Sequence, residues 1–460
     1  MVGVSLRPGF KSPRARHRLL VWPSRSSRFA RRSISSKKVT DCSDDDMGLS
    51  VECPGNSQKG FIGRPLNAIQ MFLTRQEERI LAGEEGVGRQ RAMELLVALG
   101  KIYSAERLVP ISSAHLSGVS YKTIGDGGLD FLTEMSRDAK VTVKTTLNPA
   151  GMDLDRWQEM RVKEEFAEKQ RAIISAYDSL GVETNCTCTP YLAGNVPEPG
   201  QNVAWAESSA LSFVNSVLGA RTNREGGPGA LAAAIIGKTP LYGLHLTENR
   251  LPSVIIEAEI GDGITDYSLL GHAVGQKIGT SIPFFKGIRP GVDGLKTMAA
   301  AMAAAGSVAL FYVEGITPAA SSVDLKGLET VSIGRKEIMA AKNSLTTGKE
   351  PDLIALGCPH LSETEVTNLA SFLDDKRKRS DAPEVWFCTS RTVKTWCPKE
   401  VAVLERFGKV LCDTCMIVAP IEGIHSCTAT NSAKACTYLP GLCSQKVVCD
   451  SSERLLEAVF

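Results

Sequence analysis

The chain has 460 residues, of which 43% are hydrophobic and 23% charged, and this composition predicts a folded globular protein of two or three domains with substantial cores. Its net charge of +2 hides an uneven distribution, because residues 1–40 hold eleven Lys or Arg and no Asp or Glu. The rest of the chain carries 42 basic and 51 acidic residues, and this negative balance gives no reason to expect a nucleic-acid partner.

The first forty residues are a basic leader rich in Arg and Ser. This is the composition of a mitochondrial transit peptide, although a disordered basic tail or a mispredicted start would have the same composition. The expected location is therefore the cytoplasm or the mitochondrion. Residues 41–66 contain three consecutive Asp and scattered Gly, Pro and Ser, so we expect a disordered linker there.

A globular pattern begins after this linker, and we expect residues 67–345 to form a large core. Thr74 and Glu77 form a predicted capping box for a helix that ends at Gly100. The elements that follow alternate in type: strands over 107–111 and 141–143, and helices over 128–135 and 164–180. This alternation predicts layered α/β structure.

The longest uncharged run extends from Thr297 to Val313. It is rich in Ala at first, is interrupted by Gly306 and then becomes β-branched and aromatic. A buried helix, a Gly stop and a buried strand explain this order better than a membrane span does. We therefore expect a soluble chain with no membrane partner.

Residues 346–460 predict a separate βα domain. Strands are expected over 352–356, 384–388, 409–412 and 446–449, with helices that start at Ser362, Pro398, Ser432 and Ser452. Such units form a parallel sheet, and ligands of parallel sheets gather beyond the carboxyl ends of the strands. Cys358 and Cys415 follow two of these strands.

The cysteines favour metal chemistry over disulfides. Eleven of the thirteen lie after position 185, in a long chain with no secretory segment. No Cys-x-x-Cys pair is matched by a second one, which argues against a zinc ribbon. Three thiolates from separate loops would leave one iron open to a substrate hydroxyl, as Lewis-acid dehydration requires. The alternative is that these are inert buried thiols.

Two polar clusters are candidates for substrate contacts. Asn215, Arg221, Asn223 and Arg224 lie in one Gly-rich stretch that could clamp a carboxylate, or could be a solvated turn. His115 lies among hydroxyl residues and is either a proton shuttle or a hydrogen-bonded core histidine.

Several segments together resemble the aconitase X family from about Leu73 to the end of the chain. They are the stretches 113–121, 145–153, 186–192, 215–227, 357–360, 413–415 and 431–434. The resemblance implies an α/β fold of aconitase-like layered domains with parallel sheets and a metal site at the domain interface. It also implies an iron–sulfur cluster, [4Fe-4S] or [2Fe-2S], or a mononuclear iron.

Site residues are carried over from the same resemblance. The implied metal ligands are Cys188, Cys358 and Cys415, with Cys188 preferred to Cys186 because it precedes Thr-Pro-Tyr-Leu. Catalytic roles are expected for His115, Ser432 and Lys434. Substrate contacts are expected for Ser117, Asn148, Asn215, Arg221, Asn223 and Arg224.

The implied activity is a hydro-lyase reaction that removes water from a small hydroxycarboxylate. The leader and long tail fit no archaeal isoprenoid pathway, so we expect cis-3-hydroxy-L-proline dehydratase chemistry. The alternatives are a phosphomevalonate dehydratase large subunit, a non-catalytic iron–sulfur or redox-sensing protein, and a scaffold with structural zinc. The family also uses a small swivel-type domain, for which residues 1–72 are too short and polar. We therefore expect a small partner subunit, or an N-terminal domain that this sequence has lost.

Overall fold

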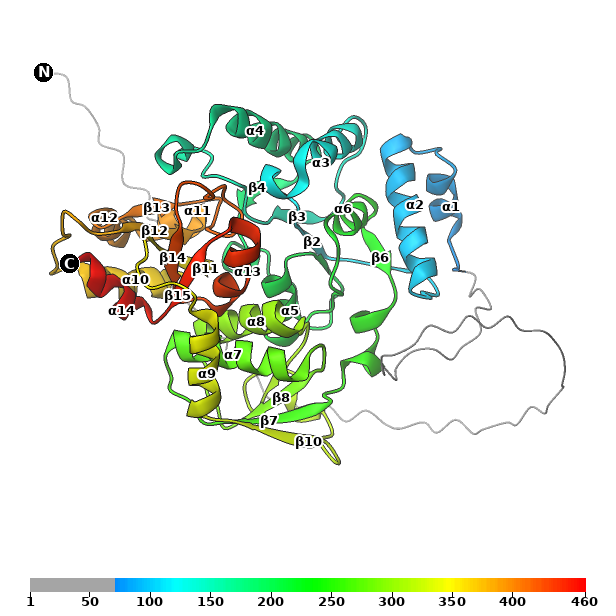
Figure 1. The fold of residues 1–460 in the computed structure, drawn as a ribbon. Helices are drawn as coiled ribbons and strands as arrows, with labels where there is room; N and C mark the ends of the chain where they lie inside the picture. Colours follow the sequence, from blue (N-terminus) through cyan, green and yellow to red (C-terminus); the bar gives the residue numbers. More distant parts are fainter. Residues whose placement is uncertain (1–70) are drawn as a thin grey trace, which may run out of the picture. The chain divides into compact units, whose positions relative to one another are not determined.

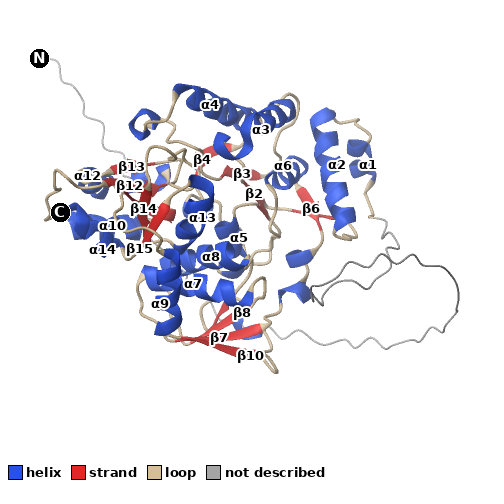
Figure 2. Ribbon diagram, viewed as in Figure 1, coloured by secondary structure: helices blue, strands red, loops and turns tan. Residues whose placement is uncertain are grey.

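The computed structural model describes residues 71–460, so the predictions for the leader and for the linker lie outside the described residues. Three parallel sheets with helices around them form the described part, together with one short antiparallel pair (Figures 1 and 2). The predicted α/β class with parallel sheets is confirmed. In residues 71–460, no helix is both long and apolar enough to cross a bilayer.

The first sheet has the strand order β4-β3-β2-β5, and all its strands are parallel. Its strands are β2 (Ser113–Leu116), β3 (Lys144–Leu147), β4 (Glu183–Cys186) and β5 (Ala204–Trp205). The helices of this region are α1 (Arg75–Leu81), α2 (Val87–Ile102), α3 (Tyr121–Met135), α4 (Glu164–Ser179), α5 (Ser208–Ser216) and α6 (Gly227–Ile236). The antiparallel pair is β1 (Leu108–Pro110) with β6 (Lys238–Pro240).

The second sheet has the order β10-β7-β8-β9 and is also parallel. Its strands are β7 (Val254–Ala258), β8 (Pro283–Lys286), β9 (Tyr312–Val313) and β10 (Glu329–Ile333), and its helices are α7 (Ile264–Ile278), α8 (Val292–Gly306) and α9 (Arg335–Leu345). The predicted 67–345 core thus contains two sheets. The uncharged run is a buried helix, a stop and a strand, as predicted.

The third sheet has the order β13-β12-β11-β14-β15. Its strands are β11 (Leu353–Leu361), β12 (Glu384–Thr389), β13 (Lys409–Leu411), β14 (Cys427–Thr430) and β15 (Lys446–Cys449). Its helices are α10 (Glu363–Leu373), α11 (Arg391–Trp396), α12 (Pro398–Glu405), α13 (Ala433–Cys443) and α14 (Ser452–Leu456). The four predicted strands are present, and β14 is a fifth that was not predicted.

Two further predictions were wrong in detail. The helix expected from Thr74 to Gly100 is two helices, because Gly83 and Gly86 take positive φ of 85° and 100° between them. No strand forms over 141–143: the backbone N–H groups of Val141 and Thr142 bond to the ends of neighbouring helices instead, and the strand begins at Lys144.

Helix α8 joins the three regions. It packs against α7, α5 and α13 (Figure 1), and ten of its residues are buried. The α7–α8 contact depends on glycine, because a Cβ at Gly271 would lie 2.5 Å from the Met298 carbonyl oxygen. A helix apolar on nearly all sides is stable only when it is enclosed in this way.

Candidate functional site

The carboxyl ends of the first and third sheets meet at one cavity of about 220 Å³. Parallel strands present their carboxyl ends at one edge of a sheet, which is where α/β folds bind ligands. We call it the cysteine cavity. Its lining is Ser117, Asn148, Pro149, Cys188, Ala206, Glu207, Ser208, Cys358, Cys415, Ile417, Val418, Lys434, Tyr438 and Leu442.

The strands explain why these side chains converge. Ser117, Asn148, Cys188 and Glu207 follow β2, β3, β4 and β5. Cys415 follows β13, Lys434 lies on α13 after β14, and Cys358 lies near the end of β11. The regular β11–β12 ladder ends at Leu356, and the chain then departs from it.

Three thiols in the cavity are almost fully buried: Cys188, Cys358 and Cys415 are 5%, 6% and 6% exposed. Burial raises the pKa of each thiol to about 12, and the Lys434 ammonium opposes this rise at all three. Cys186, by contrast, is absent from the cavity lining and packs in the apolar core. Of the two neighbouring cysteines that could be the first metal ligand, only Cys188 therefore lines the cavity.

Polar hydrogens surround the thiols. The His360 backbone N–H donates to Cys188 Sγ at 3.2 Å, and a hydrogen bond from Ser432 favours the thiolate of Cys358. Donors of this kind stabilise thiolate ligands and tune iron–sulfur centres. In residues 71–460, however, no three His, Cys, Asp or Glu side chains are arranged so that they could hold one metal ion.

A buried ion pair crosses the cavity. Lys434 Nζ contacts Glu207 Oε1 and lies 3.3 Å from Ser209 Oγ. Burial favours the neutral forms, but the pair outweighs it, so the pKa of Lys434 is raised and that of Glu207 is lowered. Glu207 also caps α5, accepting from the backbone N–H of Ser209 and of Ala210. Glu207 is not among the predicted site residues, although its place directly before a helix start is a usable signal.

His115 is fully buried beside the cavity. Its Nδ1 lies 2.9 Å from Thr146 Oγ1, whereas Nε2 has no partner, and Asn148 Oδ1 also lacks one. Burial lowers the pKa of His115 to about 4, despite opposing effects of Glu207 and Asn148, so the imidazole is neutral near pH 7. Asn148 lies close enough to His115 to raise this pKa. Asn148 lines the cavity, whereas His115 does not.

The predicted carboxylate clamp lies elsewhere. Arg221 Nη1 donates to the His245 carbonyl oxygen at 2.7 Å, and Asn215 and Asn223 bond to nearby backbone groups. Arg224 is exposed and lines a different cavity, of about 400 Å³. The structure does not bring these four side chains to the cysteine cavity.

Ser432, for which a catalytic role was predicted, caps α13. Its Oγ accepts a hydrogen bond from the backbone N–H of Ala435.

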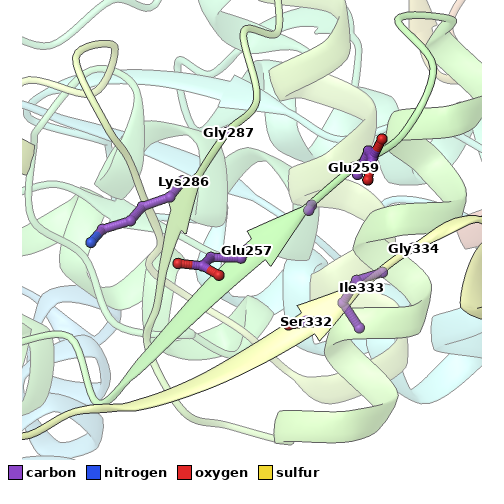
Figure 3. Close-up of a pocket in the computed structure, with 8 residues that line it drawn as sticks. Glu257, Glu259, Lys286, Gly287, Ser332, Ile333 and Gly334 are labelled. Atoms are coloured by element: carbon purple, nitrogen blue, oxygen red, sulfur yellow. The ribbon is translucent and has the colours of Figure 1, made fainter.

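A larger cavity, of about 450 Å³, lies at the carboxyl edge of the second sheet. Figure 3 shows Glu257 and Lys286 on neighbouring strands, with Glu259 beyond the end of β7. Its lining holds neither Cys nor His, and both glutamates are exposed. The cysteine cavity is therefore the better candidate for chemistry.

Comparisons with known proteins agree on one family. Models of the aconitase X first, second and third domains match residues 70–248, 252–343 and 351–460. The phosphomevalonate dehydratase large subunit of Methanocaldococcus jannaschii is 48% identical over 84% of this chain and 100% of the relative. The cis-3-hydroxy-L-proline dehydratase of Pseudomonas aeruginosa is 35% identical over 81% of this chain and 67% of the relative. The crystal structure of Thermococcus kodakaraensis aconitase X, described as the holo-form, has a TM-score of 0.79 at 44% identity and covers 85% of this chain and 100% of that one.

Proposed function

The chain belongs to the aconitase X family, and we propose that it dehydrates phosphomevalonate together with a small subunit. The named relatives are all dehydratases, so the chain is a hydro-lyase. One observation carries the assignment of the site: three buried thiols and a buried lysine–glutamate pair converge on one cavity between two sheet edges.

The choice of substrate reverses the order expected from the sequence. Phosphomevalonate dehydratase large subunits reach 46–49% identity in four relatives and are matched over 95–100% of their length. The two cis-3-hydroxy-L-proline dehydratases reach 33–35% and are matched over 67–69%. These figures support phosphomevalonate over hydroxyproline.

Hydroxyproline remains the second candidate because of the charges in the cavity. The described lining has one cation, Lys434, and one carboxylate, Glu207, which neutralise each other. A zwitterionic amino acid matches that balance, whereas a phosphorylated substrate needs further positive charge. On the phosphomevalonate proposal, the small subunit supplies this charge.

We propose that Cys188, Cys358 and Cys415 hold an iron–sulfur cluster. A single ion requires donors that converge on one point, and the described residues do not provide this arrangement. In a cluster each thiolate binds its own iron, so the three thiols can stand apart around the cavity. When bound, such a centre supplies a Lewis acid for a poor leaving group.

The protein's own residues would bind and orient the substrate. Lys434 stays protonated in its pair with Glu207, and its ammonium, which acts on all three thiols, would bind the substrate carboxylate. Ser117 and Asn148 offer hydrogen bonds from the opposite wall. His115 is neutral and its Nε2 is unpaired, so the ring can offer one further hydrogen bond at this nitrogen.

A small subunit completes this proposal, because the described lining lacks a convincing base. Lys434 is protonated, and the ion pair with Lys434 makes Glu207 weakly basic. Five relatives are named as large subunits, which implies a small subunit for them. We propose that the same kind of partner closes this cavity and supplies the proton acceptor.

The test is a dehydration assay with both substrates. The anaerobically purified chain is incubated with phosphomevalonate or cis-3-hydroxy-L-proline, with and without a small subunit from a phosphomevalonate dehydratase, and products are followed by NMR. We expect phosphomevalonate to react, with the small subunit raising kcat about 10²–10⁴-fold. Lys434→Met should abolish turnover, whereas exposed Lys399→Met should not. Preferential reaction of hydroxyproline would reject phosphomevalonate as the substrate. Full activity of the chain alone would reject the need for a small subunit.

A further inference from the structure

His360 lies behind the cysteine cavity and contacts the segments of all three candidate ligands. Its side chain is 0% exposed. Nδ1 lies 3.0 Å from the hydroxyl of Thr187, the residue before Cys188. Nε2 lies 2.9 Å from the carbonyl oxygen of Thr414, the residue before Cys415. The third segment is its own, because Cys358 lies two positions earlier in β11.

The partners of the ring fix its tautomer. A carbonyl oxygen only accepts, so Nε2 must carry hydrogen and donate to Thr414. Nδ1 is then the acceptor, and the Thr187 hydroxyl donates to it. Both nitrogens are engaged, and the backbone N–H of His360 donates to Cys188 Sγ at 3.2 Å. The imidazole therefore has no free nitrogen for proton transfer. Its two contacts connect the segment of Thr187 to the segment of Thr414.

A second buried group holds His360 from the opposite side. Lys296, on α8, is 1% exposed, and its Nζ donates to the His360 carbonyl oxygen at 3.0 Å. The same ammonium pairs with Glu365 and lies 3.3 Å from Asp293 Oδ1. Glu365 also accepts from the Ser362 backbone N–H. The backbone at His360 is thus anchored to a helix of the second region.

We propose that His360 is a positioning residue that sets the spacing of Cys188, Cys358 and Cys415. The proposal rests on the proposed role of these cysteines as ligands. Its two ring contacts are separable: His360→Asn places an amide oxygen near the Nδ1 position and keeps the Thr187 contact, whereas His360→Gln places an amide nitrogen near the Nε2 position and keeps the Thr414 contact.

The test uses the full-length chain, purified anaerobically with its iron. The first measurements are the rate of iron release to a chelator and the visible and EPR spectra of the centre. After removal of iron, the alkylation rate of each thiol by N-ethylmaleimide is mapped by mass spectrometry, with buried Cys397 as the internal reference. His245→Gln is the matched control, because His245 is 3% exposed and bonds Asn202, with no contact to the cysteine cavity.

We expect both His360 variants to release iron about tenfold faster, as for the loss of one buried hydrogen bond. His360→Asn should accelerate alkylation mainly at Cys415, and His360→Gln mainly at Cys188, by a similar factor. Thr187→Val is a milder variant that should affect Cys188 alone if the others fold poorly. Equal acceleration at every thiol, or rates equal to those of His245→Gln, would overturn the proposal. If the wild-type chain binds no iron, the ligand assignment fails, while the alkylation pattern still decides the role of His360.

Discussion

Removing the negative charge of Glu207 should destabilise the protein strongly. Glu207→Gln leaves the Lys434 ammonium, which is 6% exposed, without its counter-ion. Breaking a buried pair in this way costs about 3–5 kcal/mol. The new amide can still cap α5 through its oxygen, so most of the loss comes from the uncompensated charge. Lys434→Met should cost less, because the Glu207 carboxylate keeps its bonds to the backbone N–H groups of Ser209 and Ala210.

Urea denaturation of the metal-free chain, followed by circular dichroism, measures these free energies of unfolding. The double variant removes both charges, so it should cost clearly less than the sum of the single changes. The control is Glu164→Gln, whose exposed pair with Arg171 contributes at most about 1 kcal/mol. If Glu207→Gln costs no more than this control, the pair is solvated and the account of the cavity electrostatics is wrong.

Three further outcomes are expected. Cys188→Ala should lose bound iron by metal analysis, whereas Cys186→Ala should keep it; the opposite result would reverse the ligand assignment. Arg224→Lys should leave KM unchanged within about twofold, since its guanidinium lies outside the cysteine cavity. Burial, only partly opposed by a hydrogen bond, raises the pKa of Glu225 to about 7 from 4.5, so the folded state binds more protons and stability falls as pH rises between these values. Glu225→Gln should remove this fall, about 3 kcal/mol in unfolding free energy, whereas exposed Glu257→Gln should not.

The sequence predicts the third sheet better than the first because its signals are local. The strand at 384–389 is apolar, and Ser362 and Glu365 mark a helix start with a capping box that the structure contains. Strand β14, by contrast, reads Cys-Thr-Ala-Thr. Its polar side chains are buried by tertiary packing, and periodicity cannot reveal such a strand.

The carboxylate clamp shows where reasoning from residue type fails. Arginine and asparagine bind carboxylates well, but they bind backbone carbonyl groups equally well. The Asn215 amide donates to the carbonyl oxygens of Thr222 and Ala309. The Arg221 guanidinium donates to the carbonyl oxygen of His245 and to the hydroxyl of Thr247. A sequence cannot tell which acceptor a donor will meet, because the acceptor is supplied by the fold.

The cysteine cavity was only partly predictable for a related reason. Placing Cys358 and Cys415 at strand ends requires only the strands of one sheet. Lys434 and Glu207 are 227 positions apart in the sequence. They can pair only because the carboxyl edges of two different sheets face each other. Neither residue signals the other locally, and each alone would be a costly buried charge. The pair therefore supports this candidate site more strongly than the thiols do. Buried thiols are common, whereas a buried charge at a cavity needs a partner that only the fold can supply.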